Sequence, residues 1–273
     1  MAIQTPAARP PVVIRLLAHD LRWQLVSALA HSDRRAQELV ALLGQPANLV
    51  SYHLNQLRQA KLVRNRHSAA DHRAIYFSLD LPTVQALFTQ AGQALHPAVG
   101  EANGAPRTDI RGQLAQTNQP PTRVLFLCTH NSARSQMAEA IVRHVSKGGV
   151  EVFSAGIDPT ELHPMAIEVM EERGIPIRSQ HSKPLSPFLD QHFDTIITTC
   201  DIAREACPAF PGDPEQIHWS FADPAAVPGT EARRRAFQKT ATELTMRINY
   251  LLLVISVERG KQRRTGHTAT HSG

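Results

Sequence analysis

A cysteine and an arginine separated by five residues are the side chains in this sequence with the clearest potential for chemistry; they belong to the run Cys128-Thr129-His130-Asn131-Ser132-Ala133-Arg134-Ser135. Residues 124–127 predict a strand before this run, and the apolar spacing from about Ala133 predicts a helix after it. Such a loop points backbone N–H groups at one place, and the helix N-terminus adds positive charge, so a tetrahedral oxyanion is the expected ligand. Arg134 can bind two anion oxygens, and the same environment is expected to lower the pKa of Cys128. The run predicts a thiolate nucleophile beneath a phosphate-like anion.

The other two cysteines of the chain also come after a predicted strand. Cys200 ends the apolar run 195–199, which predicts a buried parallel strand, and Cys207 follows seven residues later. Open α/β sheets place their active sites at the carboxyl ends of such strands. Two thiols this close can form a disulfide if the segment between them loosens. The alternative is one catalytic cysteine and two structural thiols; zinc is not expected, because no Cys-x2-Cys pair or spaced histidine pair accompanies them.

Residues 122–258 resemble the low-molecular-weight tyrosine phosphatase superfamily and, within it, the thioredoxin-coupled arsenate reductases. The resemblance rests on the Cys128–Ser135 run with Gln136-Met137-Ala138-Glu139 after it. It rests also on four further segments in the same order, which are Phe153-Ser154-Ala155-Gly156, Thr199-Cys200-Asp201, Cys207-Pro208 and His218-Trp219-Ser220-Phe221-Ala222-Asp223-Pro224. An α/β domain with a four-stranded parallel sheet and flanking helices is the fold that this resemblance and the strand–helix alternation imply.

The resemblance implies a role for each site residue. Arsenate, with phosphate or sulfate as analogues, would lie against Thr129, His130, Asn131, Ser132, Ala133 and Arg134. Cys128 would attack it, Asp223 would act as general acid, and Ser135 would hydrogen-bond the thiolate. Cys200 would then attack Cys128, and Cys207 would attack Cys200, leaving a disulfide for thioredoxin to reduce. Asp223 as a simple turn residue before Pro224 is the alternative.

Two positions depart from the family pattern. Ala133 replaces a cysteine found in many members, which removes a thiol without harm to catalysis. Lys183 stands where some relatives have an acidic potassium ligand, while Asn131, Glu139 and Ser154 match the other ligands. An ammonium paired with Glu139 would replace the cation, so a potassium requirement is doubtful. No tightly bound cofactor and no metal site are expected.

Residues 12–95 predict a different, α+β domain. A helix over 38–43 ends at Gly44, and a second helix over 48–58 turns Val50, Leu54 and Leu57 toward a core and polar residues outward. Two helices joined by a short turn are typical of a helix-turn-helix, and residues 64–79 predict a β-hairpin wing after it. The residues expected to contact DNA are Asn48, Ser51, Tyr52, His53, Asn55, Arg64, Arg66 and Arg73.

This stretch resembles the ArsR family of winged-helix repressors, on the segments 38–44, 50–54 and 57–63 and the arginines of the wing. The resemblance implies a homodimer formed by this domain on double-stranded operator DNA. Many arsenic-sensing members bind trivalent arsenic through cysteines at the start of the helix before the turn. The corresponding region here is 38–42, and neither it nor the rest of this domain contains a cysteine. Its histidines His19, His31, His53, His67 and His72 are interpreted as surface or DNA-facing residues.

Charge follows the same division. Residues 12–95 hold nine Lys and Arg against five Asp and Glu, whereas residues 122–258 hold 13 against 17. A basic N-terminal domain suits phosphate contacts. Residues 96–121 predict a flexible linker, and residues 1–10 and the basic tail 259–273 are expected to be disordered. No stretch approaches the roughly 20 apolar residues that span a membrane, and no secretory signal is apparent, so a cytoplasmic protein is expected.

The expected protein is therefore a fusion of a DNA-binding regulator of arsenic resistance with an arsenate reductase. Two alternatives stay open. The phosphatase-like domain could be a non-catalytic sensor of oxyanions or of thiol oxidation that changes DNA affinity. It could also be a tyrosine phosphatase, in which Cys200 and Cys207 would have no role and in which the tyrosines common after Asp-Pro are replaced by Ala225-Ala226.

Overall fold

The structure is a computed structural model that describes residues 9–96, 99 and 120–268, with side chains described as far as Gly260. The chain divides into two compact units, one within residues 1–106 and the other within 107–273. Most of the predicted linker 96–121, most of the predicted disordered segment 1–10 and residues 269–273 of the predicted disordered tail lie outside the described residues.

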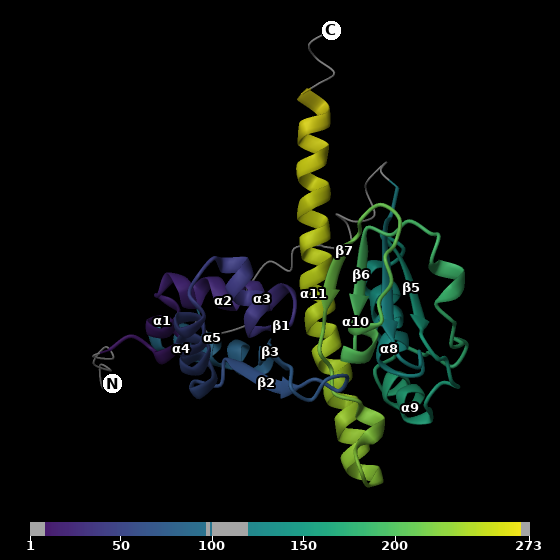
Figure 1. The fold of residues 1–273 in the computed structure, drawn as a ribbon, viewed down its shortest axis with the longest axis horizontal. Coiled ribbons are helices and arrows are strands. Elements are labelled where there is room, and N and C mark those ends of the chain that lie inside the picture. The colour runs from purple at the N-terminus through teal and green to yellow at the C-terminus, as the bar shows by residue number, and fades with distance from the viewer. Residues whose placement is uncertain (1–8, 97–98, 100–119, 269–273) are drawn as a thin grey trace. The chain divides into compact units, whose positions relative to one another are not determined.

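The N-terminal unit contains five helices and a small antiparallel sheet among its described residues (Figure 1). Its elements in chain order are α1 Val12–Leu17, α2 Asp20–His31, β1 Arg34–Arg35, α3 Ala36–Leu43, α4 Ala47–Gln59, β2 Val63–His67, β3 Ile75–Leu79 and α5 Leu81–Leu95. The strand order is β1-β3-β2, so the predicted hairpin β2–β3 has a third, two-residue strand on its other edge. Neither β1 nor α5 was predicted individually.

The helix-turn-helix of this unit is formed by α3 and α4. Gly44 ends α3 with a φ of +62°, a left-handed conformation that favours glycine, and Pro46 precedes the first turn of α4. Val50, Leu54 and Leu57 on α4 are at most 2% exposed and pack with Leu25 and Leu39 in one core. The apolar periodicity of the sequence therefore located both helices and the buried face of α4.

The C-terminal unit is built on a four-stranded parallel sheet with the order β5-β4-β6-β7 (Figure 1). Its elements are β4 Thr122–Cys128, α8 Arg134–Ser146, β5 Val150–Gly156, α9 Pro164–Glu172, η1 Ser186–Phe188, β6 Thr195–Thr198, α10 Asp201–Glu205, β7 Glu215–His218, η2 Pro224–Ala226 and α11 Thr230–Thr268. This arrangement confirms the predicted fold class.

Two apolar cores cover the two faces of this sheet, because successive side chains of a strand point to opposite faces. Val124 and Phe126 of β4 belong to the core shared with α8, α9 and α11. Leu125 and Leu127 belong to the other core, with Phe188 and Phe193. Strand β4 is buried on both faces and ends at Cys128, so its position fixes the start of the Cys128 loop.

Helix α11 shows that the prediction of a disordered tail from residue 259 is wrong for most of that segment. It is 39 residues long and continues to Thr268, so residues 259–268 are helical rather than disordered. Lys, Gln and Arg favour helix, so an established helix extends through them at little cost. Arg259 is 6% exposed and donates hydrogen bonds to the Thr122 hydroxyl and to the carbonyls of Pro120 and Gly149. Despite its length, no helix among the described residues is long and apolar enough to cross a membrane.

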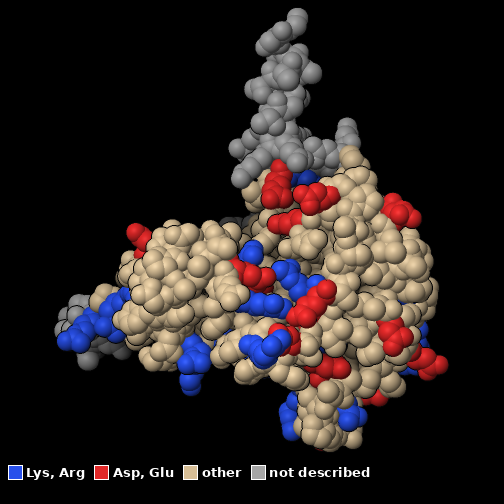
Figure 2. Space-filling view, viewed as in Figure 1, with Lys and Arg blue, Asp and Glu red and all other residues tan. Residues whose placement is uncertain are grey.

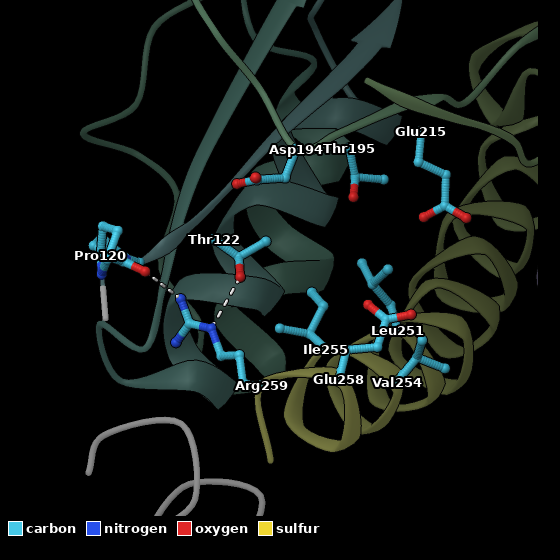
Figure 3. A pocket seen from close by; sticks show the side chains of 11 residues that line it. Pro120, Thr122, Asp194, Thr195, Glu215, Leu251, Val254, Ile255, Glu258 and Arg259 are labelled. Carbon is cyan, nitrogen blue, oxygen red and sulfur yellow. Dashed lines mark hydrogen bonds between the residues drawn. The ribbon is translucent and has the colours of Figure 1, made fainter. Parts of the chain in front are cut away.

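A pocket of about 510 Å³ lies where α11 passes the amino ends of β4, β6 and β7 (Figure 3). Thr122, Thr195 and Glu215 line it from the strands, and Arg259 lines it from α11. Cys128 lies at the opposite, carboxyl end of β4. This pocket is therefore separate from the predicted oxyanion loop.

Charged side chains form small separate groups among uncharged residues on the face shown in Figure 2. Within the C-terminal unit, several charges are paired across elements, as in Arg123 with Glu151 at 3.0 Å. Pairs this exposed contribute little to stability, so the two apolar cores are the main source of stability for this unit.

Candidate active site

Cys128 is the last residue of β4 and begins the loop that leads to α8. Its thiol is 2% exposed, 2.9 Å from the Ser135 hydroxyl and 3.1 Å from the backbone N–H of Asn131, which donates to the sulfur. The predicted hydrogen bond between Ser135 and the Cys128 sulfur is therefore present in the structure. Both contacts stabilise a thiolate, because a sulfur anion accepts from a hydroxyl and an amide at once.

The backbone carbonyls of the Cys128 loop are occupied by the next loop of the chain. The amides of Ile157, Asp158, Thr160 and His163 donate to the carbonyls of residues 128, 129, 130 and 132, at 2.9–3.3 Å. These bonds hold the carbonyls outward, which leaves the loop amides free to face an anion. His163, which had not been assigned a role, also begins α9 by accepting from Met165 N–H at 3.1 Å.

Gly156 permits this close approach of the two loops. A Cβ atom at this position would lie 2.9 Å from the Thr129 carbonyl oxygen and from both the backbone nitrogen and the Cβ of Asn131. Backbone atoms cannot move aside as a flexible side chain can, so any larger residue would displace the Cys128 loop. The sequence shows a glycine at the end of a predicted strand, but it does not show that the Cys128 loop packs against this glycine.

Asn131 holds the loop in shape from within. It has a φ of +46°, a left-handed conformation that asparagine tolerates better than most residues. Its side-chain amide donates to the hydroxyls of Ser135 and Ser154 at 2.8 and 2.9 Å, and its Oδ1 accepts from Gln136 and from the Lys183 N–H, both at 2.8 Å. Every polar atom of a side chain that is 0% exposed is thereby paired.

The rest of the predicted oxyanion loop lies around these contacts. Thr129, His130 and Ser132 are half-buried, Ala133 is buried, and the His130 Nδ1 contacts the Asp158 carbonyl at 3.0 Å. Arg134 is the first residue of α8, and its side chain is 8% exposed. Its guanidinium donates to the Phe221 carbonyl at 3.2 Å and lies 3.7 Å from the Asp223 carboxylate.

Asp223 is brought to the loop from the far end of the chain, after β7. Its side chain is 43% exposed and also accepts from the Ala225 N–H at 3.2 Å, as a turn residue would. Both interpretations of Asp223, as a catalytic acid and as a turn residue, are thus compatible with the geometry.

The second cysteine lies next to the loop. The Cys200 sulfur is 3.3 Å from the Thr129 hydroxyl, and the Thr199 N–H donates to the Leu127 carbonyl at 2.7 Å, which joins the ends of β6 and β4. Cys200 is 3% exposed, whereas Cys207, beyond the short helix α10, is half-buried. All three thiols are free. Burial raises the pKa of Cys207, and the charge of Arg204 opposes that rise.

A buried carboxylate lies behind the loop with two cationic partners. Glu139 is 2% exposed at its side chain and accepts from Ser154, from Arg143 and, at 3.2 Å, from the Lys183 ammonium. The Lys183–Glu139 pair proposed from the sequence is present. The residues therefore do not suit a potassium ion in addition, because the ammonium already supplies the positive charge.

The predicted DNA-contacting residues are only partly together. Asn48, Ser51, Tyr52 and Asn55 are exposed on one face of α4. On the wing, Arg64 and Arg66 are half-buried, while Arg73 is exposed and pairs with Asp71 at 3.2 Å. The prediction that His53 contacts DNA is wrong. Its side chain is buried, with 3% exposed, and packs against the His19 ring with centroids 4.3 Å apart. His53 lies one residue before Leu54 and therefore at the margin of the buried face, a position that periodicity alone does not resolve.

The Cys128 loop, between strand β4 and helix α8, is thus a candidate oxyanion site with a thiol beside it. Residues 123–262 match the family described as low molecular weight phosphotyrosine protein phosphatase, and residues 19–65 match the bacterial regulatory proteins of the arsR family. The chain belongs to the low molecular weight phosphotyrosine protein phosphatase family and has an ArsR helix-turn-helix domain joined to it.

Individual relatives match the C-terminal unit. The chain is 40% identical over 126 residues to an arsenate reductase of Halalkalibacterium halodurans and 38% identical to one of Bacillus subtilis, covering 46% of this chain and 91% of each relative. Among solved structures, an arsenate reductase in the phosphate binding state is 29% identical, with 49% of this chain and 98% of that chain covered and a TM-score of 0.41.

The pKa of Cys128 departs from the sequence expectation. Burial raises it, and the nearby charge of Arg134 and the hydrogen bond from Ser135 lower it without cancelling the effect of burial. The expected lowering is therefore wrong for this conformation, because the positive environment was inferred without the cost of burying a thiolate.

We predict that Cys128 titrates above an ordinary exposed cysteine. A Cys200→Ser, Cys207→Ser chain has Cys128 as its only thiol, so ultraviolet thiolate absorbance can follow it directly. The thiolate fraction should rise with pH on the alkaline side of the ordinary thiol midpoint, and Ser135→Ala should move the midpoint further up. A midpoint below that of a free thiol, or one unmoved by Ser135→Ala, would contradict the prediction.

Proposed function

We propose that the C-terminal unit is an arsenate reductase working through a three-cysteine relay. The observation on which this rests is the second thiol: the Cys200 sulfur lies 3.3 Å from the Thr129 hydroxyl of the Cys128 loop. An ester hydrolase of this family needs Cys128, Arg134 and an acid, and has no use for Cys200 and Cys207. The 40% identity to a relative named arsenate reductase supports the same assignment.

The first step uses the phosphatase-like part of the site. Loop amides and Arg134 hold arsenate, and the Cys128 thiolate attacks arsenic. Asp223 protonates the oxygen that leaves, and Ser135 and the Asn131 N–H hold the sulfur anion before attack. Because burial raises the pKa of Cys128, we expect turnover to increase from neutral toward alkaline pH.

The later steps use the two additional thiols. The Cys200 thiolate attacks the Cys128 sulfur, the sulfur–arsenic bond breaks, and its electron pair stays on arsenic, which becomes arsenic(III). Cys207 then attacks Cys200, which frees Cys128 and leaves a Cys200–Cys207 disulfide. A small dithiol protein of the thioredoxin type is the proposed reductant, and a reducing cytosol is the proposed compartment.

The N-terminal unit is proposed to be a dimeric operator-binding domain. Helices α1 and α5 contact each other and expose Val12, Ile14, Phe88 and Leu95 at 42–81%, which is an apolar surface suited to a second copy. Helix α4 presents its polar face to the major groove, and the arginines of the wing contact phosphates.

Cysteine variants test the reductase. With arsenate, thioredoxin, thioredoxin reductase and NADPH, we expect Cys128→Ser, Cys200→Ser and Cys207→Ser each to abolish steady-state arsenite production, because each removes one step of the relay. Cys207→Ser should accumulate the Cys128–Cys200 disulfide, detectable by mass spectrometry. No wild-type turnover, together with phosphate-ester hydrolysis lost only in Cys128→Ser, would identify a phosphatase instead.

Lys183 gives a separate prediction. Wild-type turnover should be equal in potassium and sodium buffers, because the Lys183 ammonium already pairs with Glu139. Lys183→Gln removes one of the two cationic partners of that buried carboxylate and leaves Arg143, so turnover should fall and be partly restored by potassium alone. Lys239→Ala, which removes an exposed lysine from α11, is the matched control. Strong potassium activation of the wild type would contradict this assignment.

DNA binding is tested with a duplex selected on the wild-type chain from a randomised pool. Asn48→Ala should cost about 1–3 kcal/mol against that duplex and relax its sequence preference, because a base contact is lost. Arg73→Ala should weaken all duplexes alike and reduce the salt slope by about 1. Failure to enrich any sequence would reject the operator proposal; affinity that changes with arsenate or thiol oxidation would favour a sensor.

A further inference from the structure

A buried carboxylate–imidazole pair adjoins Cys200 and is not used by the reaction proposed above. Asp201, the first residue of α10, and His218, the last residue of β7, are both 0% exposed. The His218 Nε2 is 3.1 Å from the Asp201 Oδ1, which also accepts from the Ser220 hydroxyl at 2.7 Å. Such a group is costly to bury and strongly destabilising to strip of one partner, so it fixes its surroundings firmly.

The pair fixes the chain on both sides of Cys200. Toward the N-terminus, the Thr198 hydroxyl contacts the His218 Nδ1 at 2.8 Å. Toward the C-terminus, Asp201 contacts the same imidazole through its carboxylate. Cys200 between them has an extended backbone and a sulfur 3.3 Å from the Thr129 hydroxyl. The His218 imidazole thus contacts Thr198 before Cys200 and Asp201 after it, on both sides of the thiol that faces the Cys128 loop.

The segment after Asp201 must behave differently. A disulfide needs Cα atoms within about 7 Å of each other, but seven residues of helix would separate Cys200 and Cys207 by about 10 Å. Helix α10 has only five residues, and Ile202 in its first turn is 42% exposed. Cys207 can reach Cys200 only if this short helix unwinds, and it must do so without moving Cys200 away from Cys128.

We infer that Asp201 and His218 are positioning residues of the relay: they hold Cys200 against the Cys128 loop while the chain from Ile202 to Cys207 unwinds. This inference rests on the proposed function, since it concerns the step in which the Cys200 thiolate displaces arsenic(III) from the Cys128 sulfur. The adjoining loop with Asp223 has its own supports, because Arg134 binds the Phe221 carbonyl and Arg247 lies over the rings of Trp219 and Phe221. Loss of the pair should therefore affect Cys200 more than the anion site.

The test follows Cys128–Cys200 disulfide formation in the full chain carrying Cys207→Ser, by rapid quenching with an alkylating agent and mass spectrometry. Two oxidants start the reaction separately. Arsenate acts through the arsenic adduct described above. Hydrogen peroxide converts the Cys128 thiolate to a sulfenic acid with release of hydroxide, and the Cys200 thiolate then displaces hydroxide from that sulfur.

With either oxidant, Asp201→Ala should slow disulfide formation about 10- to 100-fold, the loss expected for a misplaced reacting group. Asp201→Asn keeps an oxygen that can accept from Ser220 and should recover part of the rate. Affinity for inorganic phosphate should fall much less than the disulfide rate in both variants. Ile202→Ala, the exposed neighbour, is the matched control and should react at the parent rate.

Disulfide formation at the rate of the Cys207→Ser parent in both Asp201 variants would overturn the inference. An equal loss of disulfide formation and of phosphate affinity would also overturn it, because it would indicate a general structural role. A parent chain that forms the disulfide with peroxide but not with arsenate would contradict the proposed reductase alone. In that case the Asp201 variants, measured with peroxide, still decide whether the pair positions Cys200.

Discussion

Keeping the carbonyls of the Cys128 loop turned away from the anion is the constraint on which the rest of this site depends. A loop binds an oxyanion with its amides only if the carbonyls of the same residues find other partners. Here residues 157–163 supply those partners, and Gly156 lets the two backbones approach. Asn131 and Ser135 can then meet the sulfur from the other side. The loop, the strand before it and the second loop thus form one unit in which no member keeps its geometry alone.

Burial gives this unit its precision and also opposes its chemistry. A thiol that is 2% exposed is well ordered, but the same burial raises its pKa and disfavours the thiolate that must attack. The structure offsets this cost with groups aimed at the sulfur and with Arg134 nearby, rather than with solvent. Similar balances recur at Glu139 and at Asp201, where each buried carboxylate has partners on other elements. These two carboxylates are therefore tied to neighbouring elements, which links the loop to the sheet and its helices.

The sequence predicted those features that depend on local periodicity or on a compact motif. Apolar alternation and helical spacing located β4, α8, α4 and the hairpin, and the run from Cys128 to Ser135 identified the nucleophile, its hydroxyl partner and the guanidinium. Features that depend on long-range burial were missed or mistaken. The direction of the Cys128 pKa, the burial of His53 and the anchoring of Arg259 each depend on atoms more than 30 residues away in the chain. The Asp201–His218 pair was not predicted either, although both residues stood inside recognised motifs: 17 residues separate them, and only the pairing of strands and loops in the fold brings them together.

The distribution of thiols separates the two activities of the chain. All three cysteines lie between residues 128 and 207, so the ArsR-type domain has no thiol with which to bind trivalent arsenic. Arsenic(III) prefers soft thiolate ligands, and carboxylates or imidazoles do not replace them well. If this chain responds to the product of its own reaction, the thiols that respond must be those that make the product. Occupation or oxidation of Cys200 and Cys207 would then alter α10 in the C-terminal unit first, and any effect on DNA would have to follow from that change rather than from a metalloid site on the DNA-binding domain.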